Sequence, residues 1–469
     1  MSLHSSKVHF RLTPRLALSL FSLLSLLFLA VALVALRQKT SYTQSQAASP
    51  RHVPFPAALS QSAPVPASPP PADAGLSAAL AVLSADPSDA DASALLGALF
   101  AEWAAAHGRE YEGGEGGAEH GLRRAAWTGN LLRDARYEGG GARRAPNGLS
   151  DMLPAEFLAI STGRASAEFE ATTNACVWWD LFCRFWMFLR MSNVLTPDSN
   201  ITFDGATFYA NGDLPSVVDW REVDGVVGAV VTQGACGGCW AIAAAGAAKA
   251  ALFLEHGRAP PICSAEIVAC DGSSYGCQGG WPQNAFEYLA KKGSGVWLED
   301  ETCLSLSHDD VMDLLGEYDS AAVCDTIAPG GTYGGDSDIP DGIKGYAYAN
   351  TPCACYTSGY GCSCSKQDEG LMARNIAASG VAAACVDAST WMNYAGGVMT
   401  NENMGCSTQF NDLTHCLQVV GFVLDDEDVG PYWIVKNQWG SSWGVNGYAF
   451  LQMGGNTCGI ASDVLMAKL

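Results

Sequence analysis

Three short segments, far apart in the chain, carry the residue types of a site built around a nucleophilic thiol. Cys239 follows a Gly-rich stretch that begins at Gln233, His415 lies between a threonine and a cysteine, and Asn437 lies in a stretch rich in tryptophan and glycine. Such a site needs the sulfur that attacks, a base that ionises it, and a group that orients the base. Gln233 can offer its side-chain N–H to the oxyanion formed during acyl transfer. These segments therefore predict nucleophilic acyl transfer at Cys239, with no cofactor and no metal.

The surroundings of these residues resemble those in the papain-like cysteine peptidases. The stretch from Cys236 to Trp240 is similar to the family signature C-G-[SA]-C-[WY], with Gly238 in place of Ser or Ala. Further segments resemble the family's mature N-terminus, one wall of its cleft and the block around its asparagine: 214–221, 270–280 and 432–448. The separation of Cys239 and His415 exceeds the about 130–150 residues expected in this family.

The resemblance implies a role for each residue of the site. Cys239 would be the nucleophile, and His415 the base that later protonates the leaving amine. Asn437 would hold the imidazole, and Trp439 would shield that hydrogen bond from water. Gln233 and the backbone N–H of Cys239 would form the oxyanion hole.

A helix is expected to position Cys239, and strands are expected to position His415 and Asn437. Residues 239–254 are rich in alanine and form a predicted helix, so the sulfur of Cys239 would lie at its N-terminus, where the helix dipole favours a thiolate. Residues 418–422 and 433–436 have the β-branched and aromatic content of strands. The resemblance implies an α+β, two-lobed papain-like fold, in which a helical lobe with Cys239 faces a β-barrel-like lobe with the other residues. An α-helical propeptide would precede it.

The preceding region resembles the inhibitory propeptide of cathepsin L-like enzymes. We expect its first helix at 95–107, and five residues have the spacing of that propeptide's first helix: Phe100, Trp103, His107, Arg109 and Tyr111. Four more are spaced so that they lie on neighbouring faces of one helix: Glu119, Arg123, Trp127 and Asn130. Trp127 stands where the family usually has Phe, and Asp134 where an apolar residue is expected. Residues 147–151 and 156–157 resemble the next block. The alternative is an ordinary pair of surface helices.

We therefore expect five parts: a signal anchor or signal peptide (1–40), a linker rich in Pro, Ala and Ser (41–75), an inhibitory propeptide (76–164), an aromatic-rich connecting segment (165–213) and a papain-like peptidase domain (214–469). The uncharged run at 16–36 has the length of a membrane span, which favours an anchor over a cleaved peptide, although small residues near Ala30 would allow cleavage. The connecting segment could be an interfacial helix, a plug on the enzyme or ordinary packing. Inserts at 298–366 would account for the extra length before His415.

Charge and cysteine content restrict the partners and the compartment. The chain has a formal net charge of −22, which argues against nucleic acid as a partner of the peptidase domain. Its 17 cysteines indicate disulfides formed in the secretory pathway, with a lysosome, a vacuole or the extracellular space as destination. Asn200 begins a glycosylation sequon.

The resemblance implies three disulfides: Cys236–Cys277, Cys270–Cys324 and Cys406–Cys458. The pairs Cys353/Cys355 and Cys362/Cys364 would form either two disulfides across a hairpin or a zinc site, and an oxidising compartment favours disulfides. Cys385 and Cys416 are expected beside the active site as free thiols. Cys263 and Cys303 have no assigned partner.

The resemblance also implies a pocket for the substrate side chain two residues before the scissile bond. Its walls would come from Trp281, Pro282, Cys385 and Leu413, and Gly280 would offer backbone hydrogen bonds. Asp463 would form its base, so we expect the pocket to accept Leu or Phe and also Arg. The alternative is that Asp463 points outward to water.

The sequence thus predicts a cysteine endopeptidase made as a zymogen, with peptides or proteins as substrates, its own propeptide as inhibitor, and the membrane as a partner through the N-terminal apolar segment. Two alternatives stay open: a catalytically silent papain-like binding protein, and an exopeptidase whose inserts block one end of the cleft.

Overall fold

The computed structural model describes residues 74–86, 88–135, 141–161, 214–259, 262–292, 342–355 and 362–469. The predicted membrane anchor, nearly all of the linker, the aromatic connecting segment, Asn200 and most of the predicted inserts lie outside these residues. Within the described ranges, no helix combines the length and the apolar character that crossing a membrane requires.

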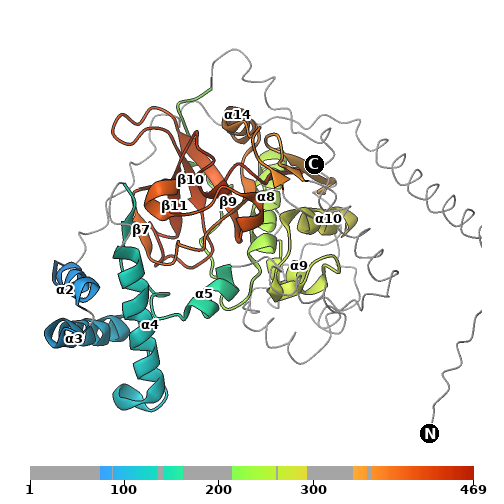
Figure 1. Ribbon diagram of the computed structural model, residues 1–469. Coiled ribbons are helices and arrows are strands. Elements are labelled where there is room, and N and C mark those ends of the chain that lie inside the picture. The colour runs from blue at the N-terminus through green and yellow to red at the C-terminus, as the bar shows by residue number, and fades with distance from the viewer. Residues whose placement is uncertain are drawn as a thin grey trace, which may run out of the picture. The chain divides into compact units, whose positions relative to one another are not determined.

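Three helices form the N-terminal part of the described chain: α2 (Ala74–Ala85), α3 (Ala90–Ala106) and α4 (Ala118–Asp134) (Figure 1). The α3 helix begins after Asp89, whose carboxylate accepts a hydrogen bond from the N–H of Ala92. The helices share a core in which the buried ring of Phe100 contacts Trp103 and Trp127, each at a centroid distance of 5.7 Å. The two helices predicted from residue spacing are therefore present, although Arg109 and Tyr111 lie beyond the end of α3 at Ala106.

The Gly-rich break between these helices forms a tight turn. It contains a short 3₁₀ helix, η2 (Gly114–Gly116), preceded by Gly113 with φ at 82°. A Cβ atom on Gly117 would lie 2.3 Å from the carbonyl oxygen of Glu112, so only glycine fits at this position. The turn lets α4 begin directly at Ala118.

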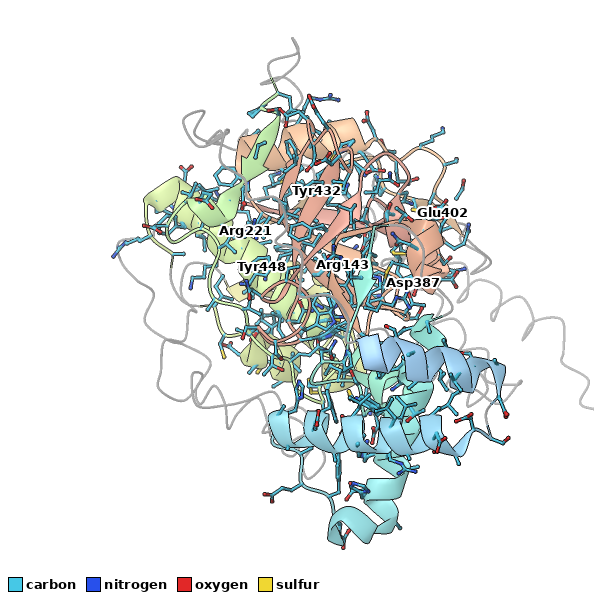
Figure 2. The ribbon with its side chains drawn as sticks, turned by 90° about the vertical axis from the view of Figure 1, so that its left-hand side faces the viewer. Arg143, Arg221, Asp387, Glu402, Tyr432 and Tyr448 are labelled. Carbon is cyan, nitrogen blue, oxygen red and sulfur yellow. A yellow bond between two sulfur atoms is a disulfide. The ribbon has the colours of Figure 1, made fainter. Side chains whose placement is uncertain are left out.

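After α4 the chain contacts the C-terminal part through two elements. Strand β1 (Arg143–Arg144) pairs antiparallel with β7 (Tyr394–Gly396), and Figure 2 labels Arg143 at this junction. Helix α5 (Pro154–Ser161) follows, and its Phe157 and Ile160 are buried in the hydrophobic core of the C-terminal part rather than in that of the N-terminal helices.

The C-terminal part is built on an eight-stranded sheet with the order β3-β12-β6-β9-β10-β11-β8, and β2 pairs with β9 off this path. The strands are β2 (Val217–Asp219), β3 (Gly345–Tyr348), β6 (Ala382–Val386), β8 (Val398–Met399), β9 (His415–Val423), β10 (Tyr432–Lys436), β11 (Tyr448–Gln452) and β12 (Val464–Lys468). Every residue of β9 is buried between its neighbours β6 and β10, both antiparallel to it. The two predicted strands lie inside β9 and β10.

Helices α8 (Cys239–His256), α9 (Ser264–Cys270) and α10 (Pro282–Lys292) form the helical side, and α8 packs against β9 and β6 (Figure 1). Small residues allow this close approach: a Cβ atom on Gly246 would lie 2.1 Å from the side-chain nitrogen of Gln418. Near β2, the guanidinium of Arg221 lies 4.8 Å from the ring centroid of Tyr448 (Figure 2) and bonds Asp219. Helix α14 (Glu369–Ser379) and the short helix α15 (Asn401–Met404) lie between β3 and β9 along the chain. An α+β two-lobed fold preceded by propeptide helices is confirmed.

The disulfides agree with part of the prediction. Cys236–Cys277 and Cys406–Cys458 are present, and Cys270 is disulfide-bonded, although Cys324 lies outside the described residues. Cys353 and Cys364 form a disulfide beside the β4 (Ala354–Cys355) and β5 (Cys362–Ser363) hairpin, which removes two of the four thiolates of the zinc alternative.

The expectation of free thiols at Cys385 and Cys416 is wrong. The two form a disulfide, because they lie directly opposite each other on β6 and β9. The sequence does not show this pairing, since nothing in it fixes the register of the two strands.

Candidate active site

A pairing between two loops brings the predicted site residues together. Just before α8, Thr232 forms an isolated bridge with Trp439, and the N–H of Gln233 donates to the carbonyl of Gln438 at 2.9 Å. The N–H of Gly440 donates to the carbonyl of Val231. The loop before the thiol and the loop after β10 are thereby held side by side.

Cys239 is the first residue of α8 and is fully buried as a thiol, not as a disulfide. Its position at the helix N-terminus favours the thiolate. The preceding Gly238 has φ at −84°, which any residue adopts, so the departure from Ser or Ala at this position has no backbone cause. The Cys236–Cys277 disulfide holds the loop before the helix, and the N–H of Gly237 donates to the carbonyl of Cys277.

His415 begins β9, and its Nε2 lies 2.8 Å from Oδ1 of Asn437, the residue that follows β10. Asn437 Oδ1 also accepts from the backbone N–H of Gln438, so an oxygen faces the imidazole and Nε2 carries the proton. Nδ1 is buried with no hydrogen-bond partner among the described residues, which leaves it as the basic nitrogen. Burial lowers the pKa of His415 to about 4, against the opposing effect of the bond to Asn437.

The ring of Trp439 lies against the imidazole, with a centroid distance of 4.7 Å to His415. Trp443 packs edge-on against Trp439 at 5.1 Å, and both rings are buried. The His415–Asn437 hydrogen bond therefore lies in an environment that excludes water, where it is stronger than in solvent.

The side-chain amide of Gln233 is directed at a carbonyl from another part of the chain. Its Nε2 lies 2.6 Å from the carbonyl oxygen of Ile160 in α5 and 2.8 Å from that of Cys236. Beside this contact, the ring of Phe157 packs edge-on against Trp439 at 5.3 Å. The segment predicted to be the end of the propeptide thus contacts two of the predicted site residues.

A second contact between the N-terminal part and the C-terminal part involves Asn393, which precedes β7 and is 1% exposed. Its backbone carbonyl accepts from the N–H of Ala145, and its Oδ1 accepts from the hydroxyl of Ser150 at 2.6 Å. Its Nδ2 donates to Asp134, which also forms an ion pair of 2.6 Å with Arg144. Burial raises the pKa of Asp134, against the opposing effects of Arg144 and Asn393.

The predicted substrate-side residues lie on several elements. Gly280 is packed so closely that a Cβ atom would lie 2.7 Å from side-chain atoms of Trp240 and Ser274. Trp281 stacks on Phe410 at 5.4 Å, and Pro282 begins α10. Leu413 lines a cavity of about 540 Å³ together with Thr414, Asp387 and Cys406.

Asp463 is 2% exposed, so the alternative in which it points to water is wrong. The side-chain nitrogen of Gln283 contacts both carboxylate oxygens, at 2.8 Å and 3.0 Å. The backbone carbonyl of Asp463 accepts from the N–H of Cys385. Asp463, Gln283 and Cys385 are therefore brought together.

Comparison with known proteins decides the family. The profile described as papain family cysteine protease matches residues 214–468, more than half of the chain. The chain belongs to the papain family of cysteine proteases.

Among relatives of this papain-family chain, human cathepsin O is 33% identical over 254 residues, which cover 54% of this chain and 66% of cathepsin O. Thiol protease aleurain of Arabidopsis thaliana is 29% identical over 271 residues, covering 56% of this chain and 62% of aleurain. The matched regions thus span about two thirds of these relatives.

Solved structures of precursors share the fold of this papain-family chain, and the similarity extends beyond the residues 214–468 that the profile matches. Procathepsin L 3 of the Tenebrio molitor larval midgut aligns with a TM-score of 0.53 at 22% identity, covering 80% of this chain and 99% of that one. The recombinant stem bromelain precursor aligns with a TM-score of 0.52 at 25% identity, covering 80% and 99%. The likeness includes the proform, which agrees with the helices before β2.

Three residues at the site were not singled out from the sequence: Asn393, Gln283 and Gln438. Asn393 and Gln283 lie outside the catalytic motifs, and no local pattern marks them. Gln438 lies directly between Asn437 and Trp439, so its buried position follows from the motif, but its contacts do not.

Proposed function

We propose that this chain is the zymogen of a cysteine peptidase in which Cys239 is the nucleophile, His415 the base and Asn437 the residue that orients the base. The sulfur of Cys239 attacks the carbonyl carbon of the scissile bond, and His415 gives its proton to the leaving amine as the C–N bond breaks. Water then hydrolyses the thioester and frees the acid and the thiol. The short His415–Asn437 distance of 2.8 Å supports these roles.

Gln233 and the N–H of Cys239 supply the oxyanion hole. The observation that carries the zymogen proposal is that the Gln233 amide already donates to a carbonyl, that of Ile160 at 2.6 Å. A carbonyl oxygen is the group that a substrate would present there. The propeptide therefore uses the donor that the reaction needs, and Phe157 covers Trp439 beside it.

Release of the propeptide is favoured by acid. While His415 is covered, burial lowers its pKa to about 4, and exposure on release returns the pKa toward its ordinary value of about 6.5. The released state thus binds more protons between these values, so a falling pH shifts the equilibrium toward release. Hydrogen bonding to Arg123 also lowers the pKa of Glu156, so their contact is lost in acid.

Protonation of Asp134 favours docking of the propeptide rather than its release. Because burial raises its pKa in the docked propeptide, docking favours the protonated carboxyl, and acid strengthens rather than weakens this contact. Acid therefore weakens the contact of Glu156 but not that of Asp134. His415 and Glu156 are the groups that favour release.

Cleavage near 211–214 separates a peptidase domain of 214–469 from the propeptide at 76–164 and from the N-terminal segments. The disulfides at Cys236–Cys277, Cys406–Cys458 and Cys353–Cys364 support folding in the oxidising secretory pathway. An acidic compartment such as a lysosome or vacuole fits the direction of the pH dependence.

The substrate pocket uses Trp281, Pro282, Cys385 and Leu413 as walls, Gly280 for backbone contacts and Asp463 as its base. The amide of Gln283 orients Asp463 without neutralising it, which supports acceptance of Arg as well as Leu or Phe.

A digest of a peptide library by the acid-treated protein, read by mass spectrometry, tests the proposed activity. We expect cleavage inside peptides, with Leu, Phe or Arg two residues before the cut. Removal of one or two terminal residues only would assign an exopeptidase, and no cleavage would favour the silent binding protein.

A further inference from the structure

Gln438 is a buried amide, 2% exposed, next to the catalytic base. Its Nε2 donates to the carbonyl of Cys416 at 2.6 Å and lies 3.3 Å from Nε2 of His415. The carbonyl of Cys416 fixes the orientation of the amide, because rotating it would bring two oxygens within 2.6 Å of each other. An N–H group of Gln438 therefore stays beside the imidazole.

The strand that provides this carbonyl is itself held in place. Cys416 is disulfide-bonded to Cys385 on β6, and both cysteines are buried. The backbone of Gln438 is also fixed, since its carbonyl accepts from Gln233 and its N–H donates to Asn437 Oδ1. The amide therefore cannot move away when the imidazole changes its protonation state.

From these contacts we propose that Gln438 is a positioning residue for His415 that disfavours the imidazolium form and so limits activity at high pH. In the tautomer set by Asn437, the Gln438 N–H faces the N–H of Nε2, and the repulsion grows when the ring gains a full positive charge. The neutral ring is thus favoured over the imidazolium.

The charged groups next to the base's neighbours have hydrogen-bond partners of their own. The neighbouring elements contribute Val386 on β6, opposite His415, and Asn437, both uncharged. Asp387 is bonded by the N–H groups of Ser389 and Ser407, and the ammonium of Lys436 donates to the carbonyl of Gly228. Among the described residues, the Cys239 thiol at the start of α8 is the proposed partner of the imidazolium.

The inference rests on the proposed function, in which activity needs a Cys239 thiolate paired with the His415 imidazolium. Loss of the imidazolium proton then gives the alkaline limb of the pH profile of kcat/KM. Gln438→Ala and Gln438→Met remove the N–H, and Met keeps most of the volume. We expect both to move the alkaline limb upward by about half a pH unit or more, and Gln438→Glu to move it further.

The matched control is Gln418→Ala, three residues after the base on the same strand β9, which removes a buried amide bonded to the carbonyl of Ile242 instead of one beside the imidazole. We expect its alkaline limb to stay in place. A fall in kcat in the Gln438 variants at every pH, with both limbs unmoved, would overturn the proposal and leave Gln438 a structural role.

A second measurement does not depend on turnover. NMR titration of the His415 imidazole in a Cys239→Ser background reports the imidazolium directly, and we expect Gln438→Ala and Gln438→Met in that background to raise its pKa. An unmoved imidazole titration would contradict the proposal. Failure of the proposed function looks different, since the parent protein itself would then show neither peptidase activity nor a low-pH thiolate at Cys239.

Discussion

Replacing Phe157 by alanine should loosen the propeptide on the peptidase without unfolding the propeptide helices. Phe157 is 4% exposed and belongs to the core of the peptidase, while Phe100 and Trp127 belong to the separate core of the helices. Truncating a buried Phe to Ala costs about 3–5 kcal/mol, which includes about 0.5–1.5 kcal/mol for an edge-on aromatic contact such as that with Trp439. At about 1.4 kcal/mol per factor of ten, 3 kcal/mol raises the open population roughly one-hundredfold.

The assay is alkylation of Cys239 by iodoacetamide in the full-length protein at neutral pH, followed by mass spectrometry. If closure is fast compared with alkylation, the rate follows the open population. The control is Leu95→Ala in α3, because Leu95 is 43% exposed and its truncation should leave the rate unchanged. Equal alkylation rates in Phe157→Ala and the parent, with the helices intact by circular dichroism, would refute the proposal that Phe157 holds the cleft closed.

Three further predictions test other parts of the proposal. Cys239→Ala should abolish turnover while leaving the melting temperature within a few degrees of the parent; residual activity equal to the parent would remove Cys239 from the mechanism. Asp463→Asn should lower the ratio of Arg-Arg to Phe-Arg substrate cleavage, and Gln283→Leu should change it less, because only the first variant removes the carboxyl group. An unchanged ratio in Asp463→Asn means that the carboxylate does not reach the substrate. Glu156→Gln should let the zymogen process itself at higher pH, because the ionised Glu156 bonded to Arg123 on α4 holds the docked helix α5 in place above the carboxyl's ordinary pKa. This contribution is lost as the pH falls through the lowered pKa of Glu156, and processing with the parent's pH dependence would contradict this role.

The sequence predicted the fold where its signals are local. The helix at Cys239 and the strands at 418–422 and 433–436 follow from alanine content and β-branched residues, and all three are present. The contact of His415 with Asn437 could be expected from the family motif, and the structure has it at 2.8 Å.

What the sequence could not predict depends on register and on contacts between distant segments. The Cys385–Cys416 disulfide exists because β6 and β9 pair with these residues opposite each other, and composition does not fix that register. Asp134 looked like a polar residue at an apolar position. The structure explains this residue, because Arg144 and Asn393, which lie outside α4, bond the carboxylate of Asp134.

The most direct test of the central claim, that Cys239 is the nucleophile of a cysteine peptidase, is labelling of the acid-activated protein with a peptide epoxide, with the adduct located by peptide mapping. We expect one adduct, on Cys239, which appears in proportion to the loss of peptidase activity and is absent from His415→Ala. An active protein without an adduct at Cys239, or an adduct there that leaves activity unchanged, would contradict the assignment.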